Sequence, residues 1–293
     1  MKTDQQPLYG ILFILTAGLL LATHDGISKH LTQLYPVFLV AWARYLSQTL
    51  LMLALFAPRM KQRIYRTQRP LAQLARGLSL VSITLLFFTG LKYIPLAEAT
   101  AVMFLTPLLV TLASALLGES ISRGQWVAVA TGLAGVLIIV RPGGSLFTPA
   151  ILLPFGGALC FTFYQLITRH ISDTEHNVAS NFLSSLVGTT VMTALVIAYW
   201  RTPTLTDGLL MAALGALAMT GHMFLTHAFR FASAATLAPF TYGQIVFAGI
   251  VGLVLFNQAP DLGAQIGIAI IIASGFCMAY LQRRNGARLE TRT

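Results

Sequence analysis

Charge is scarce in this sequence, and negative charge is the scarcest. Only 10% of the 293 residues are charged, with nine Asp and Glu residues against 19 Lys and Arg residues, whereas 56% are hydrophobic. The mean hydropathy is +0.75. Such a composition leaves no room for a sizeable soluble domain and is typical of a bundle that lies in a membrane.

Cysteine is nearly absent, and so are the motifs of common enzymes. The two cysteines, Cys160 and Cys277, lie in apolar stretches, where a small buried hydrophobe is expected rather than a disulfide or a metal ligand. The histidines lack metal-binding spacing with acidic company, and no phosphate-binding glycine loop, nucleophile elbow or ATP-binding domain is apparent. We therefore expect no enzyme activity, no cofactor and no metal.

Ten apolar stretches of membrane-crossing length fill the chain. A bilayer core needs roughly 20 residues per spanning helix and satisfies backbone groups only inside helices or closed barrels. The sequence predicts an all-α integral membrane protein with ten transmembrane helices. The expected spans are 8–32, 36–57, 71–93, 96–117, 124–141, 149–170, 177–200, 206–229, 234–256 and 262–282. The first is expected to be a retained helix and not a cleaved signal peptide.

The positive charges indicate how the chain is oriented. Lys and Arg are retained on the cytoplasmic side of short loops. With the N-terminus inside, that side collects most of them, including the basic run from Arg59 to Arg76 and the tail from Arg283 to Arg292. We expect a multi-pass protein of a bacterial-type inner membrane with both termini cytoplasmic. The charges are spread over helix ends, which favours contacts with membrane lipids and not with nucleic acid.

An internal repeat divides the ten spans into two groups of five. Lys29-His30-Leu31 aligns with Arg169-His170-Ile171, and Leu91-Lys92-Tyr93 aligns with Phe229-Arg230-Phe231. The expected domains are 1–144 and 145–293. Because five is odd, the second repeat must insert upside down relative to the first. Inverted repeats recur in secondary transporters, whose sites lie near the membrane midplane.

The first repeat resembles a known family. The stretch Pro95-Leu96-Ala97-Glu98-Ala99-Thr100-Ala101 precedes Leu105-Thr106-Pro107-Leu108, and the run from Leu117 to Ser122 precedes a helix from Gly124 to Gly135. With the two five-helix repeats, this resembles the EamA-type members of the drug/metabolite transporter superfamily. The second repeat departs from the pattern, with Asn257 opposite Glu119 and Thr236 opposite Glu98. The resemblance implies a ten-helix carrier of small organic metabolites, often amino acids or amphipathic cations, frequently directed outward.

His24 and Asp25 are the first candidates for function, because an ionisable residue inside a membrane is costly and marks a pathway or site. Arg44 in the second span reaches a similar depth, so an Asp25–Arg44 pair is feasible, with Lys29 as a competing partner. We expect Asp25, His24 and Arg44 to bind substrate, and Asp25 and His24 to couple protons. A static salt bridge remains the alternative.

Aromatic and amide side chains form a second group of candidates. Aromatic faces with a few amides suit an amphipathic organic substrate, because they offer apolar area, cation–π attraction and orientation. The substrate-binding residues expected from this group are Tyr164, Gln165, Tyr242, Gln244 and Phe104.

Small residues and prolines predict close packing and helix kinks. Gly124, Ala128 and Gly132 form a small-residue row that Gly263 and Gly267 match in the last span. Pro107 and Pro239 remove helix hydrogen bonds and are expected to kink their helices.

The expected function is a secondary transporter of small amphipathic metabolites, such as amino acids, that works by alternating access. Export is the expected direction, and uptake by the same fold is the alternative. An intramembrane enzyme that uses His24 and Asp25, or a channel, is a remote alternative; a repeated filter-like segment is missing. The expected partners are a small-molecule substrate and lipids, in a monomer or homodimer.

Overall fold

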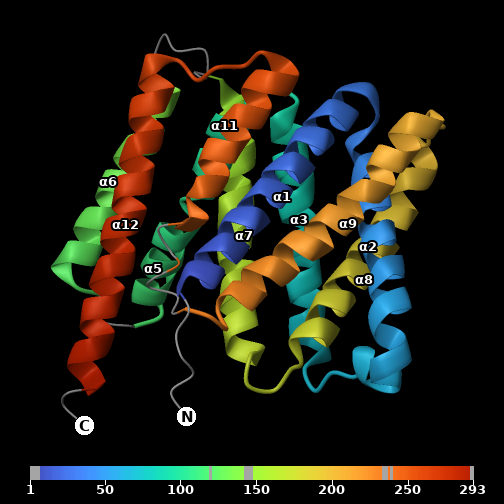
Figure 1. The fold of residues 1–293 in the computed structure, drawn as a ribbon, viewed down its shortest axis with the longest axis horizontal. Coiled ribbons are helices and arrows are strands. Elements are labelled where there is room, and N and C mark those ends of the chain that lie inside the picture. The colour runs from blue at the N-terminus through green and yellow to red at the C-terminus, as the bar shows by residue number, and fades with distance from the viewer. Residues whose placement is uncertain (1–6, 119–120, 142–147, 233–236, 238–239, 291–293) are drawn as a thin grey trace. The chain divides into compact units, whose positions relative to one another are not determined.

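The structure, a computed structural model, describes residues 7–118, 121–141, 148–232, 237 and 240–290, without the side chains of Pro7 and 282–290. Every regular element in these ranges is a helix (Figure 1). The longer ones are α1 Pro7–Leu34, α2 Val37–Met60, α3 Pro70–Leu91, α4 Leu96–Met103, α5 Thr106–Leu116, α6 Arg123–Val140, α7 Leu152–Ile171, α8 Asn177–Val196, α9 Leu205–Ala228, α11 Gly243–Phe256 and α12 Leu262–Glu290. Short 3₁₀ turns occupy Lys61–Ile64, Pro149–Ile151 and Ile197–Tyr199.

The all-α membrane fold expected from the sequence is confirmed. In the described part of the chain, nine helical segments are long and apolar enough to cross a membrane. The expected span 234–256 contains α11, a shorter apolar helix, and residues 233–236 and 238–239 lie outside the description. Pro239 and its expected kink therefore also lie outside the described residues.

The fourth span is broken into α4 and α5. Pro107 falls in the first turn of α5, where a missing N–H costs no hydrogen bond within that helix. The proline also cannot donate to the carbonyl oxygen of Met103 four residues earlier, and the Thr106 hydroxyl donates to that oxygen instead, at 2.7 Å. The expected interruption by Pro107 therefore takes the form of a break at Phe104 and Leu105, with the freed carbonyl satisfied by a side chain.

The helices form two compact units that do not follow the sequence halves. Unit 1 takes residues from Met1–Thr23, Ile94–Ile151 and Thr220–Thr293, and unit 2 is His24–Tyr93 with Leu152–Met219. The division crosses α1 after Thr23 and α9 after Met219. Each unit thus draws on both expected repeats. The expected boundary at residue 144 lies outside the described residues and stays a prediction.

Unit 1 is held together by close backbone approach. Helices α6 and α12 lie side by side (Figure 1). A Cβ atom on Gly135 would lie 2.9 Å from the carbonyl oxygen of Gly267, and one on Gly267 would lie 2.6 Å from that of Gly135. Side chains larger than hydrogen do not fit at these two positions, as the small-residue rows predict for Gly267.

Unit 2 packs α3 against α7 and α8, and α2 against α8. At one end, Met52, Ile64, Phe182 and Met219 form a buried apolar cluster. Much of the remaining interior is polar, and Lys29 is 1% exposed. This unit therefore contains buried charges, which need partners in the surrounding helices.

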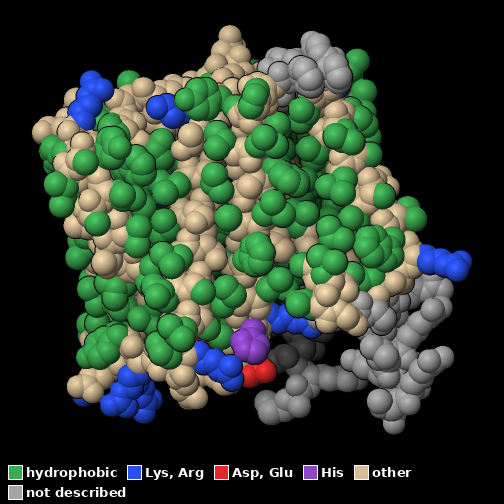
Figure 2. Space-filling view, turned by 180° about the vertical axis from the view of Figure 1, so that it is seen from behind, with side chains coloured by type: hydrophobic (Ala, Val, Ile, Leu, Met, Phe, Trp, Pro, Cys, Tyr) green, Lys and Arg blue, Asp and Glu red, His purple; other side chains and the backbone are tan. Residues whose placement is uncertain are grey.

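The outer surface suits a lipid environment. Figure 2 shows hydrophobic side chains over most of the visible face, with Lys and Arg at helix ends. Leu71, Leu116 and Leu205 are more than 80% exposed. A surface of this kind is stable in hydrocarbon and would aggregate in water.

Candidate functional site

The two halves of the first candidate, His24-Asp25 and Arg44, meet inside unit 2. His24 and Asp25 come from α1, and Arg44 comes from α2; all three are buried. His24 Nδ1 lies 2.9 Å from Asp25 Oδ1, and Arg44 Nε donates to His24 Nε2 at 3.2 Å. The imidazole ring therefore connects the acid and the guanidinium that the sequence analysis expects to pair.

The hydrogen bonds fix which histidine nitrogen carries the proton. A guanidinium can only donate, so His24 Nε2 must be the acceptor and the proton must lie on Nδ1. Nδ1–H then donates to the Asp25 carboxylate. The geometry matches a neutral imidazole between a cation and an anion.

Helix α3 completes this group, which we call the His24 cluster: His24, Asp25, Arg44, Tyr45 and Thr84. Arg44 Nη1 donates to Thr84 Oγ1 at 3.4 Å, and the Tyr45 hydroxyl lies 2.6 Å from the same oxygen. The guanidinium carbon is 4.6 Å from the Tyr45 ring centroid. Three helices thus hold one buried arginine.

Lys29 lies one turn beyond Asp25 and was expected to compete for it. Its ammonium group donates to the carbonyl oxygen of Leu91 at 2.6 Å, at the end of α3. An orphan carbonyl at a helix C-terminus is a favourable partner for a cation. Lys29 therefore also joins α1 to α3.

Tyr164 belongs to a second polar group, centred on Arg76 in α3. The Arg76 cluster consists of Arg76, Tyr164 and Thr168 from α7, and Ser180, Asn181 and Ser184 from α8. Arg76 Nε donates to Thr168 at 2.8 Å, Nη1 to the Ser180 carbonyl at 2.6 Å and Ser184 at 2.9 Å, and Nη2 to Tyr164 and to Asn181 at 3.1 Å. One guanidinium therefore connects three helices.

Arg76 is the residue that the sequence analysis missed. It was counted with the cytoplasmic basic run, yet it is 3% exposed and lies in the second turn of α3, which begins at Pro70. Its place within an apolar helix, beyond the other basic residues of that run, was the available signal. A basic residue near the start of a helix can equally well be one of the residues that set the orientation of the helix in the membrane.

Glu175, in the turn between α7 and α8, closes one end of unit 2. Its Oε1 accepts from the Thr67 hydroxyl at 2.8 Å and from the backbone N–H groups of Gln68 and Arg69 at 2.7 and 3.1 Å. Gln73 donates to Oε2 at 3.2 Å. Desolvation by itself would raise the pKa of Glu175, but these hydrogen bonds outweigh it and lower the pKa below the ordinary 4.5. The carboxylate also lies against the N-terminal end of α3, where the helix dipole favours negative charge.

The aromatic candidates of unit 1 lie at helix breaks. Phe104 follows the end of α4, and Tyr242 precedes α11; their ring centroids are 5.2 Å apart. Tyr242 also stacks on Phe276 of α12 at 5.9 Å. The structure thus brings together two expected residues and adds a third aromatic ring.

The two expected glutamines are partly exposed. Gln165 is next to Tyr164 on α7 of unit 2, and Gln244 is in the first turn of α11 in unit 1. The backbone of Gln244 is 3.4 Å from where a Cβ on Gly18 would lie, which places α11 close to α1 within unit 1. Their roles in binding stay predictions.

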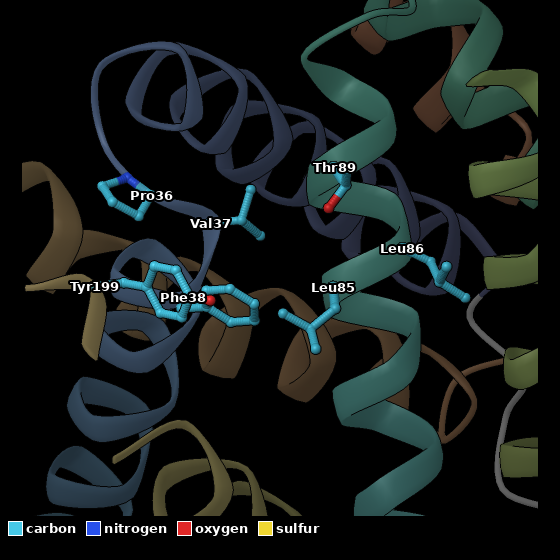
Figure 3. Close-up of a pocket in the computed structure, with 7 residues that line it drawn as sticks. All are labelled: Pro36, Val37, Phe38, Leu85, Leu86, Thr89 and Tyr199. Atoms are coloured by element: carbon cyan, nitrogen blue, oxygen red, sulfur yellow. The ribbon is translucent and has the colours of Figure 1, made fainter. Parts of the chain in front are cut away.

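A pocket of about 370 Å³ in unit 2 does not coincide with either polar cluster. Figure 3 shows its lining from the start of α2, the end of α3 and the 3₁₀ turn after α8. The lining residues are Pro36, Val37, Phe38, Leu85, Leu86, Thr89 and Tyr199. An organic ion would find no counter-charge among these lining residues.

In the part of the chain that the structure describes, no group of three or more His, Cys, Asp or Glu side chains is arranged to hold a metal ion. Cys160 is half-buried and Cys277 is exposed, both with free thiols. The groups that the two clusters and the aromatic residues offer to a ligand are hydrogen-bonding side chains, charges and aromatic rings.

Comparison with known proteins identifies the fold and the family. The EamA-like transporter family model matches residues 8–141 and again residues 148–280. A solved crystal structure with 22% sequence identity aligns with a TM-score of 0.64 over 96% of this chain and all of that one. At this identity the likeness concerns the fold.

Three named relatives show the range of the similarity. The S-adenosylmethionine uptake transporter of Rickettsia prowazekii is 28% identical over 95% of each chain. The riboflavin transporter of Vibrio cholerae is 27% identical over 94% of each chain. The pseudopaline exporter CntI of Pseudomonas aeruginosa is 30% identical over 73% of this chain and 75% of its own. With two family matches that together span most of its length, this chain is a multi-pass membrane transporter of the EamA-like family.

Proposed function

We propose that this protein is a secondary transporter that carries a small amphipathic metabolite with an amino-acid group across the inner membrane by alternating access. Its membership of the EamA-like family is the observation that supports this most strongly. The relatives that match over nearly the whole chain are named for S-adenosylmethionine and for riboflavin, both organic molecules with a large flat ring system. S-adenosylmethionine is itself an amino acid.

The described side chains offer partners for each part of such a molecule. The rings of Phe104, Tyr242 and Phe276 supply apolar area and cation–π attraction. The Asp25 carboxylate offers a counter-charge for a cationic group of the metabolite. We assign these as recognition groups within their own units, and each can be tested by substitution separately.

Uptake is the direction that we propose. The S-adenosylmethionine relative, whose name states uptake, matches over 95% of this chain. Export is the second candidate, because the pseudopaline exporter is the relative with the highest identity among these three and the sequence analysis expects export. Direction depends on the coupling gradient and not on the fold alone.

The His24 cluster suggests how substrate or proton binding could drive the change of state. A proton added to His24 Nε2 would set an N–H donor against the Arg44 N–H donor and abolish their hydrogen bond. The imidazolium would remain bound to Asp25, and Arg44 would keep Thr84 and the Tyr45 ring. A cationic group of the substrate that competes for Asp25 would weaken the hydrogen bond between Asp25 and His24, at the other end of the same series of contacts. Helix α1 would then be released from α2.

Counterflow in proteoliposomes tests this function. Labelled S-adenosylmethionine, methionine, riboflavin and a simple organic cation would be exchanged with and without an imposed pH gradient. We expect saturable exchange of S-adenosylmethionine, a pH-dependent rate and no chemical conversion. Cells that produce the protein should also accumulate the label faster than control cells.

Asp25→Asn tests the assigned charge, with Asp261→Asn as a matched control in an exposed ion pair with Arg141. We expect at least a tenfold loss of exchange for Asp25→Asn and little change for the control, because only the first acid is buried. Full, pH-independent exchange by Asp25→Asn would show instead that Asp25 forms a static salt bridge. Release of label from preloaded cells without uptake would favour export.

A further inference from the structure

Arg76 carries a buried positive charge that the proposed mechanism does not use. Its side chain has five N–H donors, and the five acceptors that meet them are two hydroxyls from Thr168 and Ser184, the Ser180 carbonyl, the Tyr164 phenol and the Asn181 amide. All five acceptors are neutral. The hydrogen bonds of Arg76 are therefore satisfied, whereas its charge is not compensated by these partners.

A buried cation with neutral partners is unusual in a membrane protein. Removing a charge from water costs several kcal/mol, which an opposite charge can offset. Arginine does not lose its proton in proteins, so it cannot escape this cost by becoming neutral. A charge kept under these conditions is a candidate functional site, and an anion would supply the missing counter-charge.

The two edges of the guanidinium differ in access. The Nη1 edge faces Ser180 and Ser184, which are 6% and 1% exposed. The Nη2 edge faces Tyr164 and Asn181, whose side chains are partly exposed. The acceptors at Nη2 are both side chains that can rotate, whereas Nη1 is also held by the Ser180 backbone carbonyl, which cannot.

The chemistry of the Nη2 edge fits a carboxylate. Tyr164 and Asn181 accept hydrogen bonds from Arg76 in the described state, and both can also donate. After rotation, the phenol O–H, the Asn181 amide N–H₂ and Nη2 would present donors to one anion. Arginine forms its strongest hydrogen bonds with carboxylate and phosphate oxygens.

We propose that the Nη2 edge of Arg76, with Tyr164 and Asn181, binds the carboxylate of the transported metabolite. This inference rests on the proposed function and deepens it, because it assigns the acidic end of the amino-acid group to unit 2. Tyr164 then binds substrate, as the sequence analysis expects, and acts together with a residue on which that analysis placed no role.

Binding to purified protein in detergent tests the site without transport. The shift of the thermal unfolding midpoint would be titrated with two probe pairs that differ at the carboxylate: S-adenosylmethionine with its decarboxylated form, and methionine with methioninamide. We expect the wild type to bind the carboxylate member about ten- to a hundredfold more tightly. Arg76→Gln should bind both members equally, and Arg201→Gln, at an exposed arginine in the same unit, should behave as the wild type.

Two milder variants keep the test decisive if Arg76→Gln does not fold. Tyr164→Phe and Asn181→Ala retain the guanidinium, and each should weaken binding of the carboxylate members alone by about three- to tenfold. Equal affinity of the wild type for both members of each pair, no binding of any carboxylate probe, or unchanged selectivity in the variants would overturn the site.

Transport distinguishes this proposal from the proposed function. Counterflow of S-adenosylmethionine by a wild type with no carboxylate preference would preserve the function and refute the Arg76 site. Selective carboxylate binding without any counterflow would preserve the site and refute the function.

Discussion

Unit 2 places charge in its interior, whereas unit 1 places small and aromatic residues there. Among the described residues, unit 2 buries Asp25, Lys29, Arg44, Arg76 and Glu175. The described part of unit 1 buries one charged side chain, Glu98, in the first turn of α4. Chemistry that depends on charge is therefore concentrated in unit 2, and unit 1 is stabilised mainly by close helix packing.

The two interiors should respond differently to substitution. Buried charges are held by specific partners, so removing one leaves another without compensation. At a closely packed glycine, any added side-chain volume destabilises the helix contact, whether or not the new side chain is charged. Substitutions that respect size but remove charge should affect unit 2, and substitutions that add one side chain should affect unit 1.

Arg44→Met should have the largest effect. It removes the guanidinium that contacts His24 and Thr84 while keeping a long side chain. We expect roughly 3 kcal/mol less stability, because the cluster would retain a buried acid without its cation, and at least tenfold slower counterflow. Arg44→Lys should recover part of the stability, since it keeps the charge. Thermal unfolding in detergent measures this stability. An Arg44→Met variant as stable as the wild type would show that the Arg44 charge does not stabilise the interior of unit 2.

Gly135→Leu tests the packing of unit 1. The new side chain would meet the Gly267 carbonyl oxygen and Ile271 within 3 Å of its Cβ, so α6 and α12 would have to separate. We expect about 1–3 kcal/mol of destabilisation. Gly249→Ala in α11 is the control, because its Cβ would lie 3.8 Å from that of Ala97. Equal stability of both variants would show that the close approach is not needed.

Glu175→Gln tests the polar closure of unit 2. The folded pKa of Glu175 lies below 4.5, so its contribution to stability is complete above about pH 4.5 and is lost as the pH falls through the folded pKa. The variant should lose about 1–2 kcal/mol at neutral pH, with less loss of stability on acidification. Thermal unfolding between about pH 3 and about pH 7 checks this. Asp173→Asn, exposed in the same turn, should keep the acid dependence.

Arg141→Gln should have the smallest effect. Arg141 and Asp261 form a 3.2 Å ion pair in unit 1, and their side chains are 39% and 45% exposed. A surface pair of this kind contributes less than about 1 kcal/mol and weakens further in salt. The backbone N–H of Ala264 is the main cause that lowers the pKa of Asp261, so the acid keeps a partner without Arg141. A large loss of stability would show that surface charge matters to unit 1.

The sequence predicted most of the helices because membrane solvation demands long apolar runs. The expected span 71–93 corresponds to α3 at Pro70–Leu91, and the span 206–229 corresponds to α9 at Leu205–Ala228. The break between α4 and α5 was visible only as Pro107. Its place at Phe104 and Leu105, and the hydrogen bond from the Thr106 hydroxyl to the Met103 carbonyl, are seen only in the structure.

The candidate site was predicted in part. His24, Asp25 and Arg44 stood out because charge is rare in apolar runs, and the structure brings them together. The sequence could not place the His24 ring between the other two, because that depends on rotamers and on the crossing of α1 and α2. Arg76 escaped notice because a basic residue near a helix start serves orientation and buried sites equally well.

By itself, the sequence determined that this protein is a helical membrane protein built as a repeat, and it singled out the ionisable residues that a membrane makes costly. Only the tertiary structure decided which partners those residues have: the imidazole between Asp25 and Arg44, and the five neutral acceptors around Arg76. The physical reason is range. Transfer free energies act residue by residue along the chain, whereas hydrogen bonds depend on distances of about 3 Å between segments far apart in sequence.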